Sequence, residues 1–168
     1  MITIIEAALT DLPIIKDLAY KIWPSTYGSI LSEKQIVYML ASFYSEECLK
    51  ENVIDKGHRF LLVKKDEKPI GFAAYEHNYL NQLVTRVHKV YMLPETQGKG
   101  YGKLVFDRID TIAMDNKMET ISLNVNRFNT ALRFYQKLGF VIVREENIAL
   151  DHGYLMEDYV LEKKIVKF

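Results

Sequence analysis

Hydrophobic positions along this chain repeat with two periods, and the change from one period to the other marks the predicted elements. The β-branched and apolar residues of 2–8 predict a strand. Apolar residues then recur at helical spacing over 12–22, with Thr10 as the candidate N-cap, so a helix follows the strand. Pro24 and Gly28 interrupt that pattern and are expected to end the helix.

Two more helices and a pair of strands are predicted before the middle of the chain. Ser32 followed by Gln35 forms a capping-box pattern for a second helix, and Ser45 starts a shorter third helix. The apolar runs RFLLVKK and PIGFAAYEH flank the polar tetrapeptide 65–68, which predicts a hairpin of largely buried strands. The apolar stretch 83–93 predicts the next strand.

The second half of the chain alternates helices and strands. A glycine cluster leads into a helical pattern that ends near Asn116, and the strand ETISLNV follows. Residues 128–138 are expected to form a helix that Gly139 closes. The runs FVIVREENI and YLMEDYVLEKKI predict two strands around the turn 151–153. This order predicts one α/β domain over 1–168, with a mixed sheet and helices on both faces.

Composition narrows the class of protein. The chain has 168 residues, 49% of them hydrophobic, which supports a sizeable core and excludes intrinsic disorder. Lys plus Arg (22) balance Asp plus Glu (22), so no overall field favours nucleic acid or an anionic membrane surface. The single cysteine, Cys48, suits a reducing compartment, and the sequence shows neither a signal-peptide pattern nor a membrane-length apolar run. We therefore expect a cytoplasmic protein with no nucleic-acid or membrane partner.

The strongest local signal is the segment QGKGYG (97–102), between an apolar strand and an amphipathic helix. At such a junction, unpaired N–H groups and the positive end of the helix dipole suit a phosphate or pyrophosphate. The spacing matches neither the Walker loop nor the dinucleotide fingerprint, because Lys103 stands in place of the latter's third glycine. A tight turn without a ligand is the simpler alternative, but it does not require three alternating glycines. We therefore expect a phosphate-binding loop.

A second motif, NTALRFYQKLGF (129–140), has apolar residues on more than one side of a predicted helix, as a plain core helix would. Together with the glycine loop, however, the order Q-x-x-G-x-G after a strand, then a strand, then N-x-A-x-x-x-Y-x-K-x-G-F resembles the GNAT superfamily of N-acetyltransferases. The resemblance covers essentially the whole chain and implies that family's mixed, mostly antiparallel twisted sheet of about seven strands. The segments VHKVYMLPETQGKG, FYQKLGF and DHGYLMEDYVLEK are most similar to the bacterial group related to PaiA, described as a polyamine acetyltransferase.

The resemblance implies a site for acetyl-coenzyme A (acetyl-CoA). In the family, N–H groups of the glycine loop hold the pyrophosphate, and the preceding strand bonds the pantetheine arm. The N–H near Met92 would receive the thioester carbonyl oxygen and create an oxyanion hole. Asn129 stands near the position of a cofactor-contacting asparagine, although it precedes Ala131 by two residues instead of three. The implied cofactor-binding residues are Val90, Tyr91, Met92, Gln97, Gly98, Lys99, Gly100, Tyr101, Gly102, Lys103, Asn129 and Tyr135.

Two residues are catalytic candidates because they can move protons. An alkylammonium acceptor has a pKa of about 10 and must lose a proton before it attacks, so a base is required. Many family members use a glutamate on the strand before the loop, but Arg86 stands there and cannot accept a proton. His88 has the same side-chain direction and is largely neutral at pH 7, so it is the candidate base, with a packed strand histidine as the structural alternative. The resemblance implies that the Tyr135 phenol gives its proton to the departing thiolate, unless this residue is a simple core tyrosine.

The other potential ligands indicate neither a metal site nor a nucleophile. His58, His77 and His152 fall at strand ends or in a turn, where we expect them to be solvated, and their spacing does not suggest a metal site. Family members transfer acetyl directly from thioester to amine, so Cys48 needs no covalent role. No metal cofactor is therefore expected.

Acceptor selection is expected from the segment after the first helix and from the last hairpin, because both border the mouth of the site in this family. The expected substrate-binding residues are Trp23, Tyr27, Tyr75, Tyr154 and Asp158. Several carboxylates could attract a cation there, namely Glu33, Glu46, Glu47, Glu76, Asp151, Glu157 and Asp158. A small primary amine such as a polyamine is the expected acceptor, and protein amino groups, amino sugars and antibiotics stay open as alternatives.

Two functions other than catalysis fit some of these features. A non-catalytic acetyl-CoA sensor would use the same loop, and the missing strand glutamate keeps that alternative open. A nucleotide-binding domain is disfavoured, because the Walker lysine and the magnesium-binding Ser or Thr are absent. Dimers through edge strands are frequent in the family, and the apolar end IVKF (165–168) suits strand addition, so a homodimer is also an open expectation.

Overall fold

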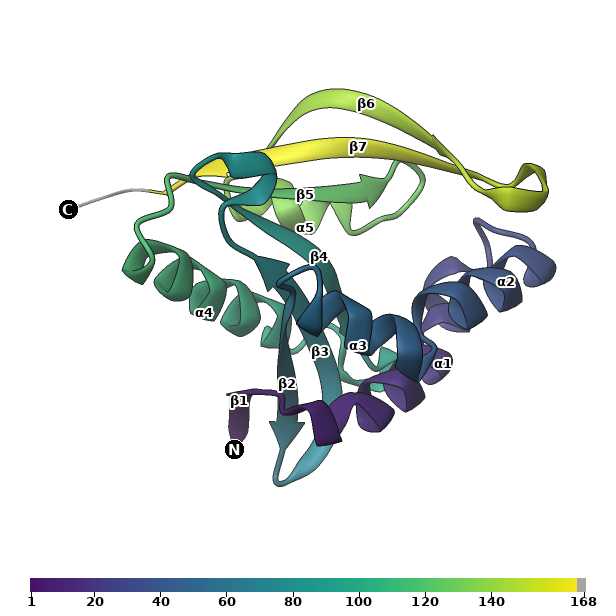
Figure 1. The fold of residues 1–168 in the computed structure, drawn as a ribbon, viewed down its shortest axis with the longest axis horizontal. Coiled ribbons are helices and arrows are strands. Elements are labelled where there is room, and N and C mark those ends of the chain that lie inside the picture. Colours follow the sequence, from purple (N-terminus) through teal and green to yellow (C-terminus); the bar gives the residue numbers. More distant parts are fainter. Residues whose placement is uncertain (166–168) are drawn as a thin grey trace.

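Seven strands pair side by side in the order β1-β2-β3-β4-β5-β7-β6 in the computed structural model, which describes residues 1–165 (Figure 1). All neighbouring strands are antiparallel except β4 and β5, which are parallel. The strands are β1 (Ile2–Glu6), β2 (Arg59–Lys65), β3 (Lys68–Glu76), β4 (Val84–Met92), β5 (Thr120–Asn126), β6 (Val141–Ala149) and β7 (Leu155–Lys164). The predicted mixed, mostly antiparallel sheet is therefore confirmed. Residues 166–168 of the apolar end proposed for strand addition lie outside the described residues.

Five α-helices cover the two faces of this sheet (Figure 1). The helices are α1 (Leu12–Tyr27), α2 (Glu33–Phe43), α3 (Glu46–Ile54), α4 (Tyr101–Asp115) and α5 (Leu132–Lys137). The first three pack on one face, and α4 covers the other. The short helix α5 joins α4 on that second face, because Phe106 of α4 packs against Phe134 with ring centroids 6.0 Å apart.

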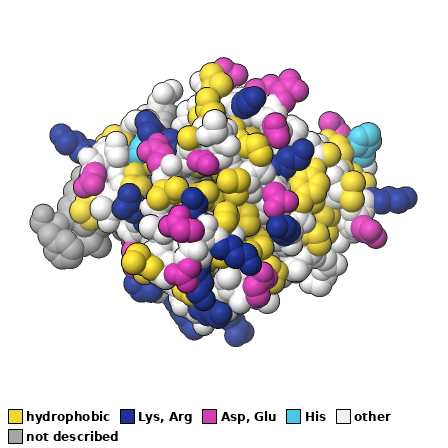
Figure 2. Space-filling view, turned by 90° about the horizontal axis from the view of Figure 1, so that it is seen from below, with side chains coloured by type: hydrophobic (Ala, Val, Ile, Leu, Met, Phe, Trp, Pro, Cys, Tyr) yellow, Lys and Arg dark blue, Asp and Glu magenta, His cyan; other side chains and the backbone are white. Residues whose placement is uncertain are grey.

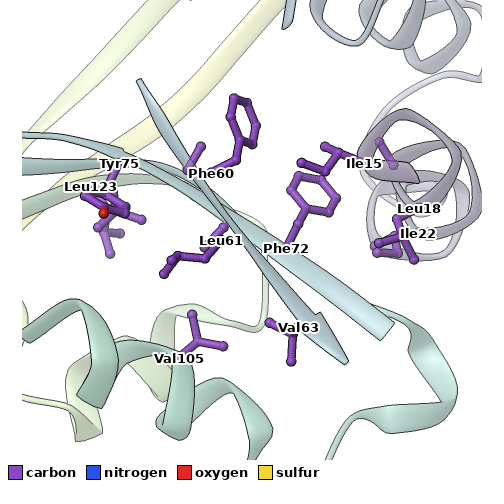
Figure 3. Packing of buried hydrophobic residues seen from close by; sticks show 14 of the residues in the cluster. Ile15, Leu18, Ile22, Phe60, Leu61, Val63, Phe72, Tyr75, Val105 and Leu123 are labelled. Carbon is purple, nitrogen blue, oxygen red and sulfur yellow. The ribbon is translucent and has the colours of Figure 1, made fainter. Parts of the chain in front are cut away.

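Alternation along β2 and β3 divides the core into two layers (Figure 3). Phe72 faces Ile15 and Ile22 of α1, whereas Leu61 and Val63 point toward the α4 face. Successive side chains of a strand point to opposite faces, so the apolar runs of β2 and β3 supply both layers at once. This explains why these strands read as continuous apolar segments.

The predicted helix starts are confirmed where a side chain caps them. The Ser32 Oγ accepts a hydrogen bond from the Gln35 backbone N at 3.1 Å, and the Ser45 Oγ accepts one from the Cys48 backbone N at 3.1 Å. Each cap satisfies one of the N–H groups that a helix start leaves unpaired. The Gln35 side chain does not close the capping box, because it donates to the Leu155 carbonyl oxygen at 3.2 Å.

Three predicted boundaries are wrong. Helix α1 continues through Pro24 to Tyr27. Pro24 lacks an N–H and so removes one helical hydrogen bond, but the burial of Trp23 and Tyr27 stabilises this last turn. A short 3-10 helix (Leu9–Asp11) precedes α1, so Asp11 and not Thr10 is its N-cap. Helix α5 begins at Leu132 instead of 128, since the chain before it forms a turn.

The surface carries charges of both signs. Figure 2 shows Lys and Arg side chains interspersed with Asp and Glu side chains over one face of the molecule. Such mixing is what the balanced composition predicts, and it leaves no broad single-sign field on that face. Within residues 1–165, no helix combines the length and the apolar character needed to cross a membrane.

Candidate functional site

The parallel strands β4 and β5 separate partway along the sheet. They pair only over 84–87 and 120–123, whereas β3 stays paired with β4 out to Met92. Beyond the last β4–β5 pair, a cleft of about 780 Å³ opens between the strands and continues to the start of α4. The backbone groups of β4 that face this cleft have no partner from β5, so they are available to a bound molecule.

The glycine loop forms one end of the cleft. Gly98 (φ 77°) and Gly100 (φ 80°) adopt left-handed backbone conformations, and Gly100 is the N-cap of α4. A Cβ at Gly102 would lie 3.1 Å from the Phe134 Cζ, so this position requires a close approach of α4 to α5. The loop therefore presents the start of a 15-residue helix to the cleft.

The predicted cofactor residues fall into two groups. Those that line the cleft are Val90, Tyr91, Met92, Gln97, Gly98, Gly100, Tyr101, Gly102, Asn129 and Tyr135. Lys99 and Lys103 do not line it; Lys103 is exposed and its Nζ pairs with the Asp107 Oδ2 at 2.9 Å. The Asn129 Oδ1 accepts a hydrogen bond from the Ala131 N at 2.9 Å, so this side chain caps the turn before α5.

Tyr135 reaches the cleft from α5. Its ring packs edge-on against Phe106 and Phe140, with centroid distances of 5.6 and 6.1 Å. Burial raises the pKa of the Tyr135 phenol above its usual value, so the hydroxyl keeps its proton throughout the neutral range. The side chain is thus a held, protonated donor beside the glycine loop.

Aromatic side chains from α1 and β4 form the opposite wall. The Tyr27 and Tyr91 hydroxyls lie 2.9 Å apart, and both residues line the cleft. Burial raises the pKa of Tyr27 to about 12. Trp23 packs behind them, with its ring 4.7 Å from Tyr27 and 5.8 Å from Tyr91, and does not itself line the cleft.

A polar chain crosses the sheet just below this wall. Arg86 hydrogen-bonds the Asn124 Oδ1, and the Asn124 Nδ2 donates to the Asp158 Oδ2 at 3.2 Å. The Asp158 Oδ1 is buried and has no hydrogen-bond partner among residues 1–165. Burial raises the pKa of this carboxyl above the usual aspartate value. Because Asn124 lines the cleft, Asp158 lies directly behind the cleft wall.

His88 occupies a β-bulge where β4 leaves the regular ladder. Ala74 pairs with Lys89 and Tyr75 pairs with Val87, so His88 is the extra residue between them. Its Nε2 lies 2.7 Å from the Glu76 Oε1, and the residue lines the cleft. Burial and the neighbouring His58 lower the pKa of His88 to about 2, which keeps the imidazole neutral.

The expectation that His58 is solvated is wrong. Its side chain is 9% exposed, because its ring stacks on His88 with centroids 3.9 Å apart. Sequence position alone suggested a strand end, but the bulge in β4 brings His88 across to cover it. Burial lowers the pKa of His58 to about 4, with Lys89 contributing.

The remaining predicted substrate residues lie farther from the cleft. Tyr75 is 3% exposed and beside Leu123 in the core (Figure 3), because its strand position faces α4. Tyr154 lies at the β6–β7 turn, its ring 5.5 Å from Tyr38 of α2. Cleft-lining residues that the sequence analysis did not single out include Ser25, Thr26, Asn124 and Phe128. Only the alternation of ISLNV hinted at Asn124, and nothing local marked the others.

Comparisons with known proteins agree with this fold. The sequence model of the Acetyltransferase (GNAT) family matches residues 17–140. A crystal structure of PaiA N-acetyltransferase from Thermoplasma acidophilum in complex with coenzyme A is 27% identical and superposes with a TM-score of 0.81, covering 98% of this chain and 99% of that chain. The spermidine N(1)-acetyltransferase of Thermoplasma acidophilum is 25% identical over 168 residues, which cover 97% of either protein.

A further relative is similar over a shorter region. An uncharacterized N-acetyltransferase of Methanocaldococcus jannaschii is 27% identical over 86 residues, which are 48% of this chain. The matching region spans 38% of that relative's length.

Proposed function

Because this chain belongs to the Acetyltransferase (GNAT) family of acetyl-CoA-dependent N-acetyltransferases, we propose that it transfers acetyl from acetyl-CoA to the primary amine of a small molecule, with polyamines as the acceptor class. The observation that carries this proposal is the cleft between β4 and β5. It joins a glycine loop at a helix start to His88 and the aromatic wall. The similarity to a spermidine N(1)-acetyltransferase supports the choice of acceptor.

The residues at the loop end fit the cofactor. The cleft offers a glycine loop with two left-handed residues, a helix start and the unpaired edge of β4. Loop N–H groups would hold the pyrophosphate, and the backbone over 90–92 would hold the pantetheine arm. When bound, acetyl-CoA supplies a thioester whose acetyl carbon the amine attacks.

The acceptor end fits a cationic amine. The unpartnered Asp158 Oδ1 places a negative charge behind the wall that Tyr27 and Asn124 form. Its link through Asn124 to Arg86 fixes the carboxylate orientation. Electrostatic attraction to this carboxylate would draw an ammonium group to the cleft before reaction.

Two side chains would move the protons. Since the Nε2 of His88 faces Glu76, the Nδ1 is the nitrogen left to accept a proton from the acceptor ammonium. Tyr135 would give its phenolic proton to the departing thiolate and recover one afterwards. Tyr135 is held protonated at pH 7, as an acid must be, whereas the geometry and not the lowered pKa of His88 supports its role, because a lowered pKa makes the imidazole a weaker base.

Two assays on the same protein test the proposal. Saturating acetyl-CoA should raise the melting temperature, since a ligand at 100 times its Kd stabilises by about 2.7 kcal/mol. Thiol release should then require an amine, tested with spermidine, amino acids, amino sugars and a peptide. Stabilisation without release for any amine would favour a non-catalytic sensor, and no stabilisation would contradict both readings.

The variant Tyr135→Phe separates catalysis from binding. It should lower kcat about tenfold or more and leave the Kd for acetyl-CoA unchanged, because the hydroxyl group is removed while the ring that packs against Phe106 and Phe140 is kept. The exposed Tyr20 on α1 offers a matched control, and Tyr20→Phe should change neither quantity. An unchanged kcat in Tyr135→Phe would remove the acid role.

A further inference from the structure

One lysine, Lys89, lines the cleft. Among the described residues around the cleft, it is the only one that carries a primary amine. It follows His88 on β4 and directly precedes the backbone over 90–92, which is proposed to hold the pantetheine arm. The protein therefore places an amine of its own in the compartment proposed to bind the thioester.

The Lys89 side chain lies at the acceptor end of the cleft. Lys89 and Tyr91 are two residues apart on β4 beyond the bulge, so their side chains project from the same face of the sheet. Phe72 pairs with Tyr91 and faces α1 (Figure 3), so this is the face of the aromatic wall. A strand rises about 3.3 Å per residue, which separates the two side chains by about 7 Å. The four-carbon stem of lysine is flexible, so the amine can move within this region without a change in the backbone.

The Lys89 Nζ lies over two aromatic rings and not against a carboxylate. It is 5.5 Å from the centroid of the Tyr44 ring and 5.6 Å from that of the Phe60 ring. Within residues 1–165, no salt bridge involves this nitrogen. The amine therefore lacks the oppositely charged partner that would hold it in the ammonium form.

The surroundings of Lys89 increase its neutral fraction. Burial lowers the pKa of the Lys89 amine to about 8, and the positive charge of Lys56 contributes. An amine with that pKa is about one-tenth neutral at pH 7, whereas the ordinary lysine pKa near 10.4 leaves about one part in 2,500 neutral. The neutral amine is the nucleophilic form, so Lys89 is better prepared to attack a thioester than a lysine at the surface.

We propose that Lys89 is a self-acetylation site, at which the Nζ takes the acetyl group of acetyl-CoA bound in the same cleft. The inference rests on the proposed function, because it requires acetyl-CoA in that cleft. It adds a covalent modification of this chain, which acetyl transfer to a small amine does not require.

Atoms and charges balance in this transfer. The Lys89 ammonium loses one proton to water, and the neutral Nζ attacks the carbonyl carbon of the acetyl group. A C–N bond forms and the C–S bond of the thioester breaks, so the sulfur leaves as a thiolate. The nitrogen loses its second proton as the amide forms, while Tyr135 gives a proton to the thiolate and recovers one afterwards. Two protons leave the nitrogen and one ends on the sulfur, so one proton is released and no other reactant is needed.

The test measures acetyl incorporation into the wild-type protein in the absence of any amine. Protein incubated with acetyl-CoA at about pH 7.5 should gain one acetyl group by intact mass, and peptide mapping should place it on Lys89. Lys21 is the internal reference for spontaneous surface acetylation, because its side chain is 61% exposed and lies outside the cleft. Lys89 should react at least about tenfold faster than Lys21, since a bound thioester acts at high effective concentration. Excess coenzyme A, which lacks the acetyl group and competes for the cleft, should slow only the reaction of Lys89.

The kinetics distinguish transfer within one molecule from transfer between molecules. The rate constant for Lys89 should saturate with acetyl-CoA and should not change with protein concentration. A rate that rises with protein concentration would show transfer from one protein molecule to another and would overturn the proposal.

The pH dependence gives an independent readout. Only the neutral amine attacks, so the rate should rise about tenfold per pH unit below pH 8 and level off above it. The titratable groups that face Lys89 are Tyr44 after α2, Cys48 on α3, Lys56 after α3, His58 before β2 and His88 on β4. The variant Cys48→Ser should keep both the rate and the profile. Loss of the modification in Cys48→Ser would show that the thiol passes the acetyl group on, and would overturn direct transfer to Lys89.

The outcomes separate this proposal from the proposed function. If the protein acetylates an amine but Lys89 stays unmodified, or reacts no faster than Lys21, the self-acetylation site is wrong and the enzyme stands. If Lys89 is modified and no amine of the panel is acetylated, the site is supported and transfer to a small amine is contradicted. If acetyl-CoA neither stabilises nor modifies the protein, both proposals fail. The variant Lys89→Arg should gain no acetyl group beyond the Lys21 background, and an undiminished gain would overturn the assignment to Lys89.

Discussion

The two ends of the cleft are built from different chemical groups: the backbone at one end and side chains at the other. The loop end uses backbone N–H groups from one short segment, 97–102, and the edge of one strand. The acceptor end uses the side chains of residues that are far apart in sequence, among them Tyr27, His88, Asn124 and Asp158. Backbone donors carry a fixed partial charge at every pH, whereas the side chains of Tyr27, His88 and Asp158 titrate and depend on their neighbours. Changes at the loop end should therefore alter cofactor affinity, and changes at the acceptor end should alter turnover and its pH dependence.

The largest effect is expected at the acceptor end, from His88→Gln. Loss of the base should lower kcat about 100-fold or more, since general-base catalysis contributes on that scale. Steady-state kinetics with spermidine should show an unchanged KM for acetyl-CoA. His77, whose Nδ1 lies 2.9 Å from the Thr85 Oγ1 outside the cleft, supplies the control His77→Gln. A rise in the acetyl-CoA KM with unchanged kcat would contradict the view that the acceptor end governs turnover and the loop end governs cofactor affinity.

At the loop end, Gly100→Ala should weaken cofactor binding. A non-glycine residue in the left-handed conformation costs about 1–2 kcal/mol, so the loop should leave its binding geometry and raise the Kd about five- to thirtyfold. Calorimetric titration with acetyl-CoA measures this directly. Gly57 also has a positive φ of 72° but lies away from the cleft, so Gly57→Ala should lower the melting temperature without raising the Kd. Equal affinities for the two variants would show that the loop backbone does not hold the cofactor.

A smaller, substrate-specific effect is expected from Asp158→Asn. Removing the buried negative charge should raise the KM for spermidine about tenfold, close to the value of a hydrogen bond to a charged group, and leave the acetyl-CoA KM unchanged. Because burial raises the pKa of Asp158, the wild-type KM should begin to rise on acidification at a higher pH than an ordinary aspartate would give. In the Asp158→Asn variant, the KM for spermidine should not rise on acidification in this way. A KM that falls with acid in both proteins would contradict the assignment.

The smallest effect concerns stability and not activity. The folded-state pKa values of His58 (about 4) and His88 (about 2) lie below the unfolded value near 6.5, so acid protonates the unfolded chain first. Stability is therefore full above about pH 6.5 and falls as pH decreases, by at most about 1.4 kcal/mol per pH unit for each histidine. Urea unfolding between pH 7 and 5 should show a shallower loss for His58→Phe than for the wild type. Parallel curves would mean that His58 is not buried in the neutral form.

Much of the loop end could be predicted from the sequence, because its chemistry is local. The junction of strand, glycines and helix lies within consecutive residues, and the structure gives Gly98 and Gly100 the left-handed conformations that only glycine adopts readily. The caps at Ser32 and Ser45 were predictable for the same reason, since a cap and its partner are three residues apart. The placement of Tyr135 in the cleft followed from a motif resemblance and not from periodicity.

The acceptor end required the tertiary structure. Glu76 and His58 look like ordinary strand ends in the sequence, and only the β2–β3–β4 pairing with a bulge at His88 brings them together. Likewise, the β5–β7 pairing sets Asp158 opposite Asn126, which brings its carboxylate within hydrogen-bond distance of Asn124, two residues away on β5. The sequence by itself determined the fold class and the glycine loop at the start of α4, because periodicity and backbone conformation depend on near neighbours. The tertiary structure alone decided which carboxylate serves which histidine, since strand register and bulges set contacts between residues that are distant in sequence.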